Sequence, residues 1–443
     1  MSDTSPSRPT FGQAAAYWLR LGFVSFGGPA GQIALMHEDL VERKRWISEK
    51  RYLHALNYCM VLPGPEAQQL ATYIGWLMHG RWGGLVAGGL FVLPSLLLLI
   101  ALTWVYLAFG QVPAVAGVLY GIKPAVTAIV VSAAVRIGSR ALKNAWLWGL
   151  AAAAFVAIFA LGLPFPLIVL AAAVVGYFGG RFAPDKFAVG GGHGKAGDSS
   201  APAVIDDDTP TPPHALFTWA RFAGVLGVGL GLWAVALGSL WAWLGADAVL
   251  TQMGWFFTKA ALLTFGGAYA VLPYVYQGAV EHFQWLTAPQ MIDGLALGET
   301  TPGPLIMVVA FVGFVGGWTR ELFGPTALPL AGAVAACVVT FFTFLPSFVF
   351  IFLGGPFIES THGNLRFTAP LTGITAAVVG VIVNLAVFFA YHVLWPAGWG
   401  GAFEWPAAII GAAAAWALFR AKWSVIRVVL VSGLLGLAWQ LLR

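Results

Sequence analysis

Long apolar runs recur along this chain of 443 residues and constrain its fold more than any other feature. Several of them approach the roughly 20 residues that a helix needs to cross the hydrocarbon core of a bilayer. Only 9% of the residues are charged, whereas a soluble domain carries about 25%. A soluble core could not hide this much apolar surface, so the chain is predicted to be an all-α polytopic membrane protein. The net charge of +5 is then attributed to cytoplasmic loops, and no nucleic-acid partner is expected.

The sequence contains two copies of one unit. Three motifs of the first copy return at the same offset of 239 residues: Ser25-Phe26-Gly27-Gly28 as Thr264-Phe265-Gly266-Gly267, Trp46-Ile47-Ser48 as Trp285-Leu286-Thr287, and Pro63-Gly64-Pro65 as Pro302-Gly303-Pro304. Farther along, Pro94-Ser95 matches Pro346-Ser347 at an offset of 252 residues. The second copy therefore carries a net 13 extra residues between its Pro-Gly-Pro and Pro-Ser motifs.

Composition divides the chain into four parts. The stretch 183–215 is rich in Gly, Asp and Pro, and such a segment cannot bury enough apolar surface to fold. We predict a first membrane repeat at 1–182, a flexible cytoplasmic linker at 183–215, an extra transmembrane helix at 216–245 and a second membrane repeat at 246–443.

Each copy has four clear apolar runs after its motifs, at about 84–109, 115–135, 145–160 and 164–180, and at about 327–353, 369–392, 405–419 and 425–442. The motif regions, 12–42 and 52–79 with their copies near 250–280 and 290–317, are broken in the middle by Gly or Pro. The Lys and Arg clusters near 43–51, 136–143, 181–186 and 420–427 fall on one side of the membrane only if each broken region returns to the side it entered from.

The positive-inside rule makes that side the cytoplasm. The predicted fold is therefore two inverted-topology repeats, each with two re-entrant helical hairpins followed by four transmembrane helices, plus one extra linking transmembrane helix. This arrangement has nine spans and a cytoplasmic N-terminus and linker. The alternative, in which every broken region crosses the membrane, has thirteen spans and remains open.

The breaks supply backbone that is neither helix nor strand. At membrane depth such backbone survives only where protein buries it or where it lines a watery cavity. A helix that starts after the break exposes free N–H groups and positive potential, which favour an anion. The alternative is that the breaks are only kinks or packing turns. The neutral candidates for substrate binding are Ser25, Gly27, Gly28, Asn57, Pro63, Gly64, Pro65, Gln68, Thr264, Gly266, Gly267, Thr300, Thr301, Pro302, Gly303 and Pro304.

Three cations lie inside apolar segments, where charged side chains are costly and usually functional. Arg20 and Lys259 are related by the offset of 239 residues, and each precedes a Phe-Gly-Gly turn. Both are candidates to balance a doubly charged anion, although both could also extend to the membrane interface. Lys123 is a third candidate, and its counterpart in the second copy is Thr375.

Two carboxylates flank the Pro-Gly-Pro breaks at unmatched positions. Glu66 follows the first break and Glu299 precedes the second. We expect one or both to carry protons, although Glu66 could merely complement the helix dipole. Ser48 and Thr287 are assigned to structure, as N-caps, and Thr287 with Gln290 has capping-box form. No nucleotide-binding, metal-ligand or nucleophile motif is present in the sequence, so neither an enzyme, a metal nor a cofactor is expected.

Phe23 to Gln32 and Leu56 to Ala71 resemble the signature of the chromate ion transporter family in its long, two-domain form. The resemblance implies a secondary transporter that exports chromate from the bacterial cytoplasm across the inner membrane, powered by the proton-motive force, and so confers chromate resistance. The second copy departs from the first after Pro304, where Leu305-Ile306-Met307 replaces Glu66-Ala67-Gln68. Two equivalent sites are therefore not expected.

Alternatives to this function remain open. Chromate and sulfate share shape and charge, so a transporter of sulfate or another oxyanion fits the same residues. A passive anion channel is a second alternative, and a chromate reductase is disfavoured because redox-cofactor motifs are absent from the sequence. The expected partners are the chromate (or sulfate) anion and the lipid bilayer, and a homodimer remains open.

Overall fold

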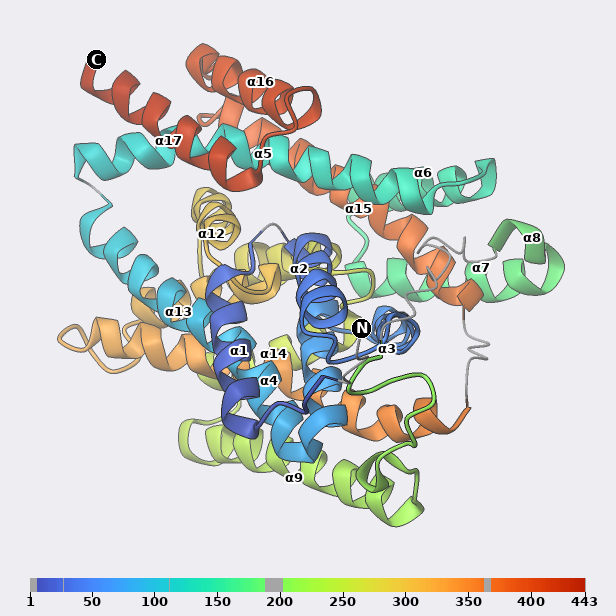
Figure 1. Ribbon diagram of the computed structural model, residues 1–443. Helices are drawn as coiled ribbons and strands as arrows, with labels where there is room; N and C mark the ends of the chain where they lie inside the picture. The colour runs from blue at the N-terminus through green and yellow to red at the C-terminus, as the bar shows by residue number, and fades with distance from the viewer. Residues whose placement is uncertain (1–5, 27, 111, 188–201, 362–367, 443) are drawn as a thin grey trace.

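The protein is described by a computed structural model that covers residues 6–26, 28–110, 112–187, 202–361 and 368–442. Within these residues the chain forms helices and no strands, apart from one isolated bridge between Ile47 and Ile205. Figure 1 shows the helices stacked in layers, with α9 along the lower edge and α16 and α17 at the top. The prediction of an all-helical fold is confirmed.

The helices of the first copy are α1 (Phe11–Val24), α2 (Gly28–His37), η1 (Glu38–Arg43), α3 (Glu49–Val61), α4 (Glu66–Phe109), α5 (Pro113–Ala141), α6 (Ala145–Phe159) and α7 (Phe165–Phe182). Between the copies lie α8 (Pro184–Phe187), η2 (Pro213–Ala215) and α9 (Trp219–Leu244). The second copy contains α10 (Val249–Leu263), α11 (Ala268–Tyr276), η3 (Gln277–His282), α12 (Ala288–Thr300), η4 (Leu305–Met307), α13 (Val308–Thr319), α14 (Leu328–Thr361), α15 (Thr368–Leu394), α16 (Trp405–Phe419) and α17 (Val425–Leu442).

The order of elements repeats at the offset found in the sequence. In each copy two helices enclose the Phe-Gly-Gly turn and are followed by a π-helical turn, which spans Glu38–Arg43 in the first copy and Gln277–His282 in the second. The next helix is capped by Ser48 in the first copy and by Thr287 in the second. Both predicted N-caps are confirmed, and Thr287 forms the predicted capping box with Gln290.

Helix α4 reverses direction within its length. His79 and Gly80 have non-helical backbone angles, and Gly80 has a φ of 66°. Gly75 packs against Gly83 and Ala87, so residues 66–79 fold back along the following segment. In the second copy α13 folds back on α14 in the same way, because Gly313 lies against Ala335. The extra residues of the second copy fall at this turn, between the end of α13 and the start of α14.

The later helices of the two copies pack reciprocally. Helix α5 lies along α16 and α17, and α15 lies along α6 and α7; α5 and α6 extend across the upper part of Figure 1. The backbones approach closely at small residues, since a Cβ at Gly121 would lie 1.9 Å from the Ser432 carbonyl oxygen. A Cβ at the corresponding Gly373 would lie 2.4 Å from the Ala172 carbonyl oxygen. Small residues allow this contact between membrane helices.

Seven of the described helices are long and apolar enough to cross a membrane: α4, α5, α7, α9, α14, α15 and α17. Helices α6 and α16 are apolar but have 15 residues each. A multi-pass membrane protein is therefore supported, while the count of nine spans stays a prediction.

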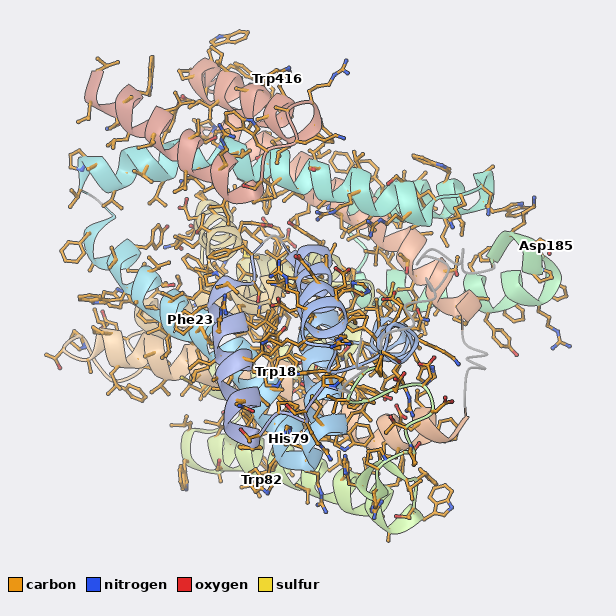
Figure 2. All side chains as sticks on the ribbon, in the orientation of Figure 1. Trp18, Phe23, His79, Trp82, Asp185 and Trp416 are labelled. Carbon is orange, nitrogen blue, oxygen red and sulfur yellow. The ribbon has the colours of Figure 1, made fainter. Side chains whose placement is uncertain are left out.

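The outward surface carries large aromatic and aliphatic side chains. Trp82 is 72% exposed and Trp416 is 62% exposed, and Figure 2 shows both on outward-facing helices. By contrast Trp18 is buried between α1 and α4. So much exposed apolar surface is unfavourable in water and suits contact with lipid, where Trp collects at the interfaces.

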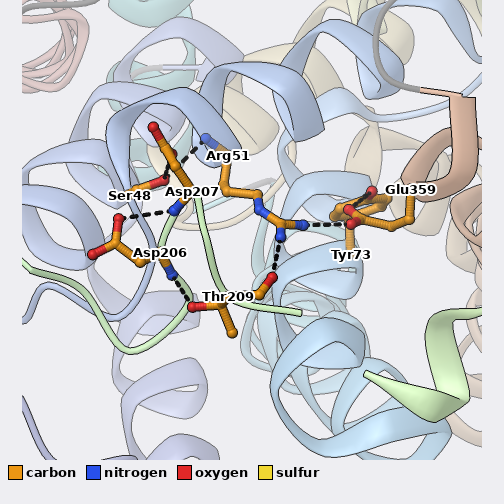
Figure 3. A network of polar contacts seen from close by, with 7 residues as sticks. All are labelled: Ser48, Arg51, Tyr73, Asp206, Asp207, Thr209 and Glu359. Atoms are coloured by element: carbon orange, nitrogen blue, oxygen red, sulfur yellow. Dashed lines mark hydrogen bonds and ion pairs between the residues drawn. The ribbon is translucent and has the colours of Figure 1, made fainter. Parts of the chain in front are cut away.

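Part of the expected linker is packed rather than flexible. Ile205 is buried, and its backbone N–H donates to the Trp46 carbonyl at 3.0 Å. Figure 3 shows the neighbouring contacts, in which Ser48 donates to Asp207 at 2.6 Å and Arg51 to the Thr209 carbonyl at 2.6 Å. These contacts differ from the flexible connector expected for 183–215, because an apolar side chain and two polar pairs anchor residues 202–215 to the first copy. Residues 188–201 of that segment lie outside the described residues.

The contact between α5 and α17 predicts a stability effect. Gly121→Ala would force the two backbones apart, and overpacking of this kind costs about 1–3 kcal/mol. We expect a lower midpoint of thermal unfolding for the detergent-purified protein. Gly89→Ala is the control, because a Cβ there would meet nothing within 4 Å and alanine favours the helix by about 1 kcal/mol. Equal midpoints in the two variants would contradict this packing.

Candidate functional site

The Phe-Gly-Gly turn of each copy is joined to the Pro-Gly-Pro turn of the other. The Gly64 N–H donates to the Thr264 carbonyl at 2.7 Å, and the Gly303 N–H donates to the Ser25 carbonyl at 2.8 Å. The two hydrogen bonds are equivalent in the repeat, because Gly303 lies 239 residues after Gly64 and Thr264 lies 239 residues after Ser25. The four breaks found in the sequence are thus paired across the copies.

The side chains at the turns close the ends of the preceding helices. Ser25 and Thr264 are fully buried. Their hydroxyls donate back to Leu21 and Ala260 respectively. These groups satisfy carbonyls that the end of a helix leaves without partners. Their backbone carbonyls accept the hydrogen bonds from the opposite turn, and a part for their side chains in substrate binding stays a prediction.

Two glutamines add contacts in the first copy alone. Gln32 donates through Nε2 to the Gly303 carbonyl at 2.5 Å, and Gln69 donates to the Pro63 carbonyl at 2.8 Å. Their counterparts at 239 residues are Val271 and Val308. The amide Oε1 atoms of both glutamines are buried without a protein partner among the described residues. These two positions are therefore polar in the first copy and apolar in the second.

The glycines at the Pro-Gly-Pro turns have no room for a side chain. Gly64 and Gly303 have φ angles of 130° and 103°, which L-residues rarely adopt. A Cβ at Gly64 would lie 2.5 Å from the Ser347 hydroxyl, and one at Gly303 would lie 2.7 Å from the Ser95 Cβ. Each Pro-Ser motif thus packs on the Pro-Gly-Pro turn of the other copy.

The two helices that follow these turns begin differently. Helix α4 starts at Glu66 after Pro65, and the Gln69 N–H is the first to bond back, to Pro65 at 3.0 Å. The N–H groups of its first turn thus have no partner within the helix. The second copy instead makes a 3₁₀ turn before α13, with the Met307 N–H bonded to Pro304 at 2.9 Å. The predicted positive helix end is therefore better developed at α4.

The three candidate cations occupy different surroundings. Arg20 is exposed on α1. Lys259 is half-buried on α10, with its ammonium 5.7 Å from the centre of the Trp255 ring. Lys123 on α5 forms an ion pair with Asp293 at 3.4 Å. The structure therefore does not bring these three side chains to one point, and their roles in binding stay predictions.

The two candidate proton carriers are also unlike. Glu299 is buried on α12 and accepts a hydrogen bond from the Tyr269 hydroxyl. Arg136 on α5 interacts with this pair electrostatically. Glu66 is half-buried at the start of α4, and within the described ranges its carboxylate has no hydrogen bond or ion pair. A carboxylate removed from water without a cation is costly, so the position of Glu66 suits a group that takes up protons. A proton-carrying role for Glu66 and Glu299 stays a prediction.

The remaining candidates contribute unevenly. Asn57 is exposed on α3, and Gln68 donates to Thr72 at 3.0 Å. The hydroxyls of Thr300 and Thr301 donate to carbonyls of their own helix. Gly28, Gly266 and Gly267 have positive φ angles, as their turns require. Gly27 lies outside the described residues.

Sequence reasoning missed Asp293, which lies buried on α12 between Lys123 and Tyr106. The Tyr106 hydroxyl donates to Asp293 at 2.9 Å. A signal was present, because Asp293 is an acidic residue inside the expected hairpin 290–317, where charged residues are usually functional. Gln32 carried no comparable signal, since a glutamine next to a glycine-rich turn is common in exposed loops.

The fold and this centre define the class of the molecule, a multi-pass membrane protein in which broken helices from two copies of one unit meet. The family described as Chromate transporter matches residues 12–177 and 251–437. The two matches begin 239 residues apart, which is the offset of the repeat. The chain belongs to the chromate transporter family, and it is therefore a transport protein rather than an enzyme.

Individual relatives agree with this assignment. A chromate transport protein of Pseudomonas aeruginosa is 33% identical over 86% of this chain and 81% of its own length. A chromate transport protein of Cupriavidus metallidurans is 32% identical over 86% of this chain and 83% of its own length. A probable chromate transport protein of Synechococcus elongatus is 29% identical over 85% of this chain and 83% of its own. No solved structure matches the chain.

The joined turns predict that Gly64 and Gly303 are indispensable. Gly64→Ala and Gly303→Ala combine an unfavourable φ with a steric clash, so we expect loss of at least nine-tenths of anion flux in proteoliposomes. Gly245→Ala is the matched control, because its φ is also positive, at 92°, but a Cβ there would meet nothing within 4 Å. Flux as low in the Gly245 variant as in the other two would show that backbone strain alone, and not the packing of the turns, explains the loss.

Proposed function

We propose that the protein is a secondary transporter that exports chromate from the cytoplasm across the inner membrane, driven by the proton-motive force, and thereby confers chromate resistance. The observation that carries the proposal is the reciprocal pairing of the broken helices at Gly64 with Thr264 and at Gly303 with Ser25. Transporters bind their substrates near the bilayer midplane at such interfaces between repeats. Membership in the chromate transporter family supports chromate as the anion.

The proposed topology is two inverted repeats, 1–182 and 246–443, each with two re-entrant hairpins and four spans. The two arms of each second hairpin lie side by side, because the Tyr58 ring contacts the Tyr73 ring in the first copy and Gly294 packs against Phe311 in the second, and this supports the hairpins. The packing of residues 202–215 against the loop that carries Arg45 and Arg51 supports a linker on the same side as that basic cluster. The positive-inside rule makes that side the cytoplasm.

The proposed anion site lies at the start of α4. Chromate is a tetrahedral dianion, and the free N–H groups and positive end of a helix favour such a ligand. The N–H groups of Gly64 and Gly303 already bond across the turns, so the donors come from the first turn of α4. Lys123 supplies positive charge from α5 in this proposal, while Arg20 and Lys259 attract the anion toward the path.

The test is chromate uptake into inside-out membrane vesicles that contain the protein. We expect saturable accumulation that requires an energised membrane, because export from the cell is uptake in this orientation. Sulfate competition at equal concentration measures selectivity among tetrahedral dianions. Flux that does not saturate and ignores the membrane energy would identify a passive channel instead, and an absence of chromate accumulation would overturn the proposal.

Glu66 and Glu299 are the proposed proton carriers, and their neutral isosteres give a prediction. In Glu66→Gln or Glu299→Gln vesicles, collapse of the pH gradient should change chromate uptake less than it does in the wild type, because a glutamine cannot exchange protons. Glu42→Gln is the control, since this side chain is 61% exposed. Wild-type dependence on the pH gradient in both variants would remove these residues from the coupling mechanism.

A further inference from the structure

Asp293 is a buried carboxylate held by groups from two other helices. It is 3% exposed. Its Oδ2 atom lies 3.4 Å from the Lys123 ammonium of α5 and accepts a hydrogen bond from the Tyr106 hydroxyl of α4 at 2.9 Å. Its Oδ1 atom is buried without a partner among the described residues. Lys123 retains 30% side-chain exposure, so this cation can be approached from outside the pair.

The charged surroundings of Asp293 are simple. Helix α12 packs against α4, α5, α13, η4, α15 and α17. From α4 and α5 the ionisable groups that face Asp293 are Tyr106 and Lys123, and α13 and η4 contain no ionisable residue. Among the other ionisable groups of α5 and α17, Tyr120 donates to Glu404, Arg136 acts electrostatically on Glu299, and Arg427 lies over the Trp423 ring. On α15, Tyr391 and His392 lie near its C-terminal end.

The pair joins Lys123 of the first copy to Asp293 of the second, and the sequence repeat does not contain an equivalent pair. The counterpart of Asp293 is His54 and the counterpart of Lys123 is Thr375. Thr375 lies beside the second Phe-Gly-Gly turn, 3.9 Å from the position of a Cβ at Gly266. Lys123 occupies the equivalent position in the first copy, so this position of the repeat is one that lies beside a Phe-Gly-Gly turn. A cation at this position lies close to the broken helices, and Asp293 neutralises it.

We propose that Asp293 is the internal counter-anion of Lys123, which the transported oxyanion displaces when it binds. An ammonium is a compact charge with three donors, and a carboxylate and an oxyanion compete for it directly. Asp293 thus sets the affinity for the substrate and favours its release, because the carboxylate returns to Lys123 when the oxyanion leaves. This inference rests on the proposed function as an oxyanion transporter.

Displacement has a consequence for protons. Once Lys123 pairs with the oxyanion, Asp293 is left buried without a cation, which strongly disfavours its charged form. It then takes one proton from water and becomes a neutral carboxylic acid, with no change in the bonds of the substrate. One proton that moves with a dianion leaves one net negative charge to transfer. The membrane potential, negative inside, therefore still drives export.

The experiment measures the KM for chromate uptake in inside-out vesicles. Asp293→Asn removes the competing charge at constant size, so KM should fall roughly tenfold, the usual scale of a hydrogen bond to a charged group. Adding Lys123→Gln should abolish that gain, because the asparagine then has no cation to release. Glu359→Gln is the matched control: it also removes a buried carboxylate paired with a cation and a tyrosine, Arg51 and Tyr73, and should leave KM unchanged.

A pH series adds a readout that a purely structural role would not move. Chromate itself takes up a proton near neutral pH, so each variant is compared with the wild type at the same pH. The wild type should gain affinity as pH falls relative to Asp293→Asn. Tyr106→Phe removes a donor that stabilises the charged carboxylate, so the pH profile of KM should shift to higher pH. This variant keeps the test open if Asp293→Asn does not fold.

The outcomes separate this inference from the function on which it rests. Wild-type vesicles that transport no chromate would overturn the proposed function. Wild-type transport combined with an unchanged or higher KM in Asp293→Asn would overturn the role of Asp293 alone. A fall in KM that also appears in Glu359→Gln, or that persists after Lys123→Gln is added, would equally overturn it, because the effect would not act through Lys123.

Discussion

The two hydrogen bonds between Gly64 and Thr264 and between Gly303 and Ser25 are the interactions on which the rest of the molecule depends. Backbone that leaves a helix inside a membrane must find partners within the protein. Each copy leaves one carbonyl and one N–H open at its turns, and the other copy supplies the matching group. Neither copy could satisfy these groups alone in the same way, so the paired turns require both copies of the repeat.

Local chemistry made much of the fold predictable. Glycine, proline and the cap residues Ser48 and Thr287 act on their immediate neighbours, so the helix breaks and starts could be predicted from the sequence. The pairing of the turns could not, since a hydrogen bond between Gly64 and Thr264 spans 200 residues and leaves no local pattern. For the same reason the packing of Ile205 and the ion pair of Asp293 were missed. Each depends on which distant helix lies alongside, which the sequence of one segment does not specify.

The two copies share their helix packing but differ in the polar residues at equivalent positions. Close approaches of backbone recur in both, as at Gly121 and Gly373, because packing constrains them equally. The polar groups differ: Glu66 corresponds to Leu305, and Lys123 to Thr375. A single substrate that lies between two related halves contacts both, so only one set of polar groups is needed. Each copy is then free to be apolar where the other is polar, since Leu305 corresponds to Glu66 and Met60 to Glu299, which lowers the cost of burying the centre.

Among the residues that the structure describes, two ion pairs connect the copies, and their positions differ in a way that bears on movement. Arg51 of the first copy pairs with Glu359 of the second at 2.6 Å, and Lys123 pairs with Asp293 at 3.4 Å. Tyr73, which donates to Glu359, is adjacent to Thr72, and Thr72 packs against Gly84. Tyr106, which donates to Asp293, lies 22 residues after Gly84 on α4. This separation is roughly 30 Å at 1.5 Å per residue. The pairs thus lie toward opposite ends of the same helix.

Any motion of one copy against the other must strain at least one of them. Arg51 is 12% exposed and is also bonded to the Thr209 carbonyl, whereas Lys123 is more accessible and its pair is longer. Under the proposed function, the pair at Lys123 is therefore the one that an arriving anion reaches, whereas the pair at Arg51 is the more enclosed of the two.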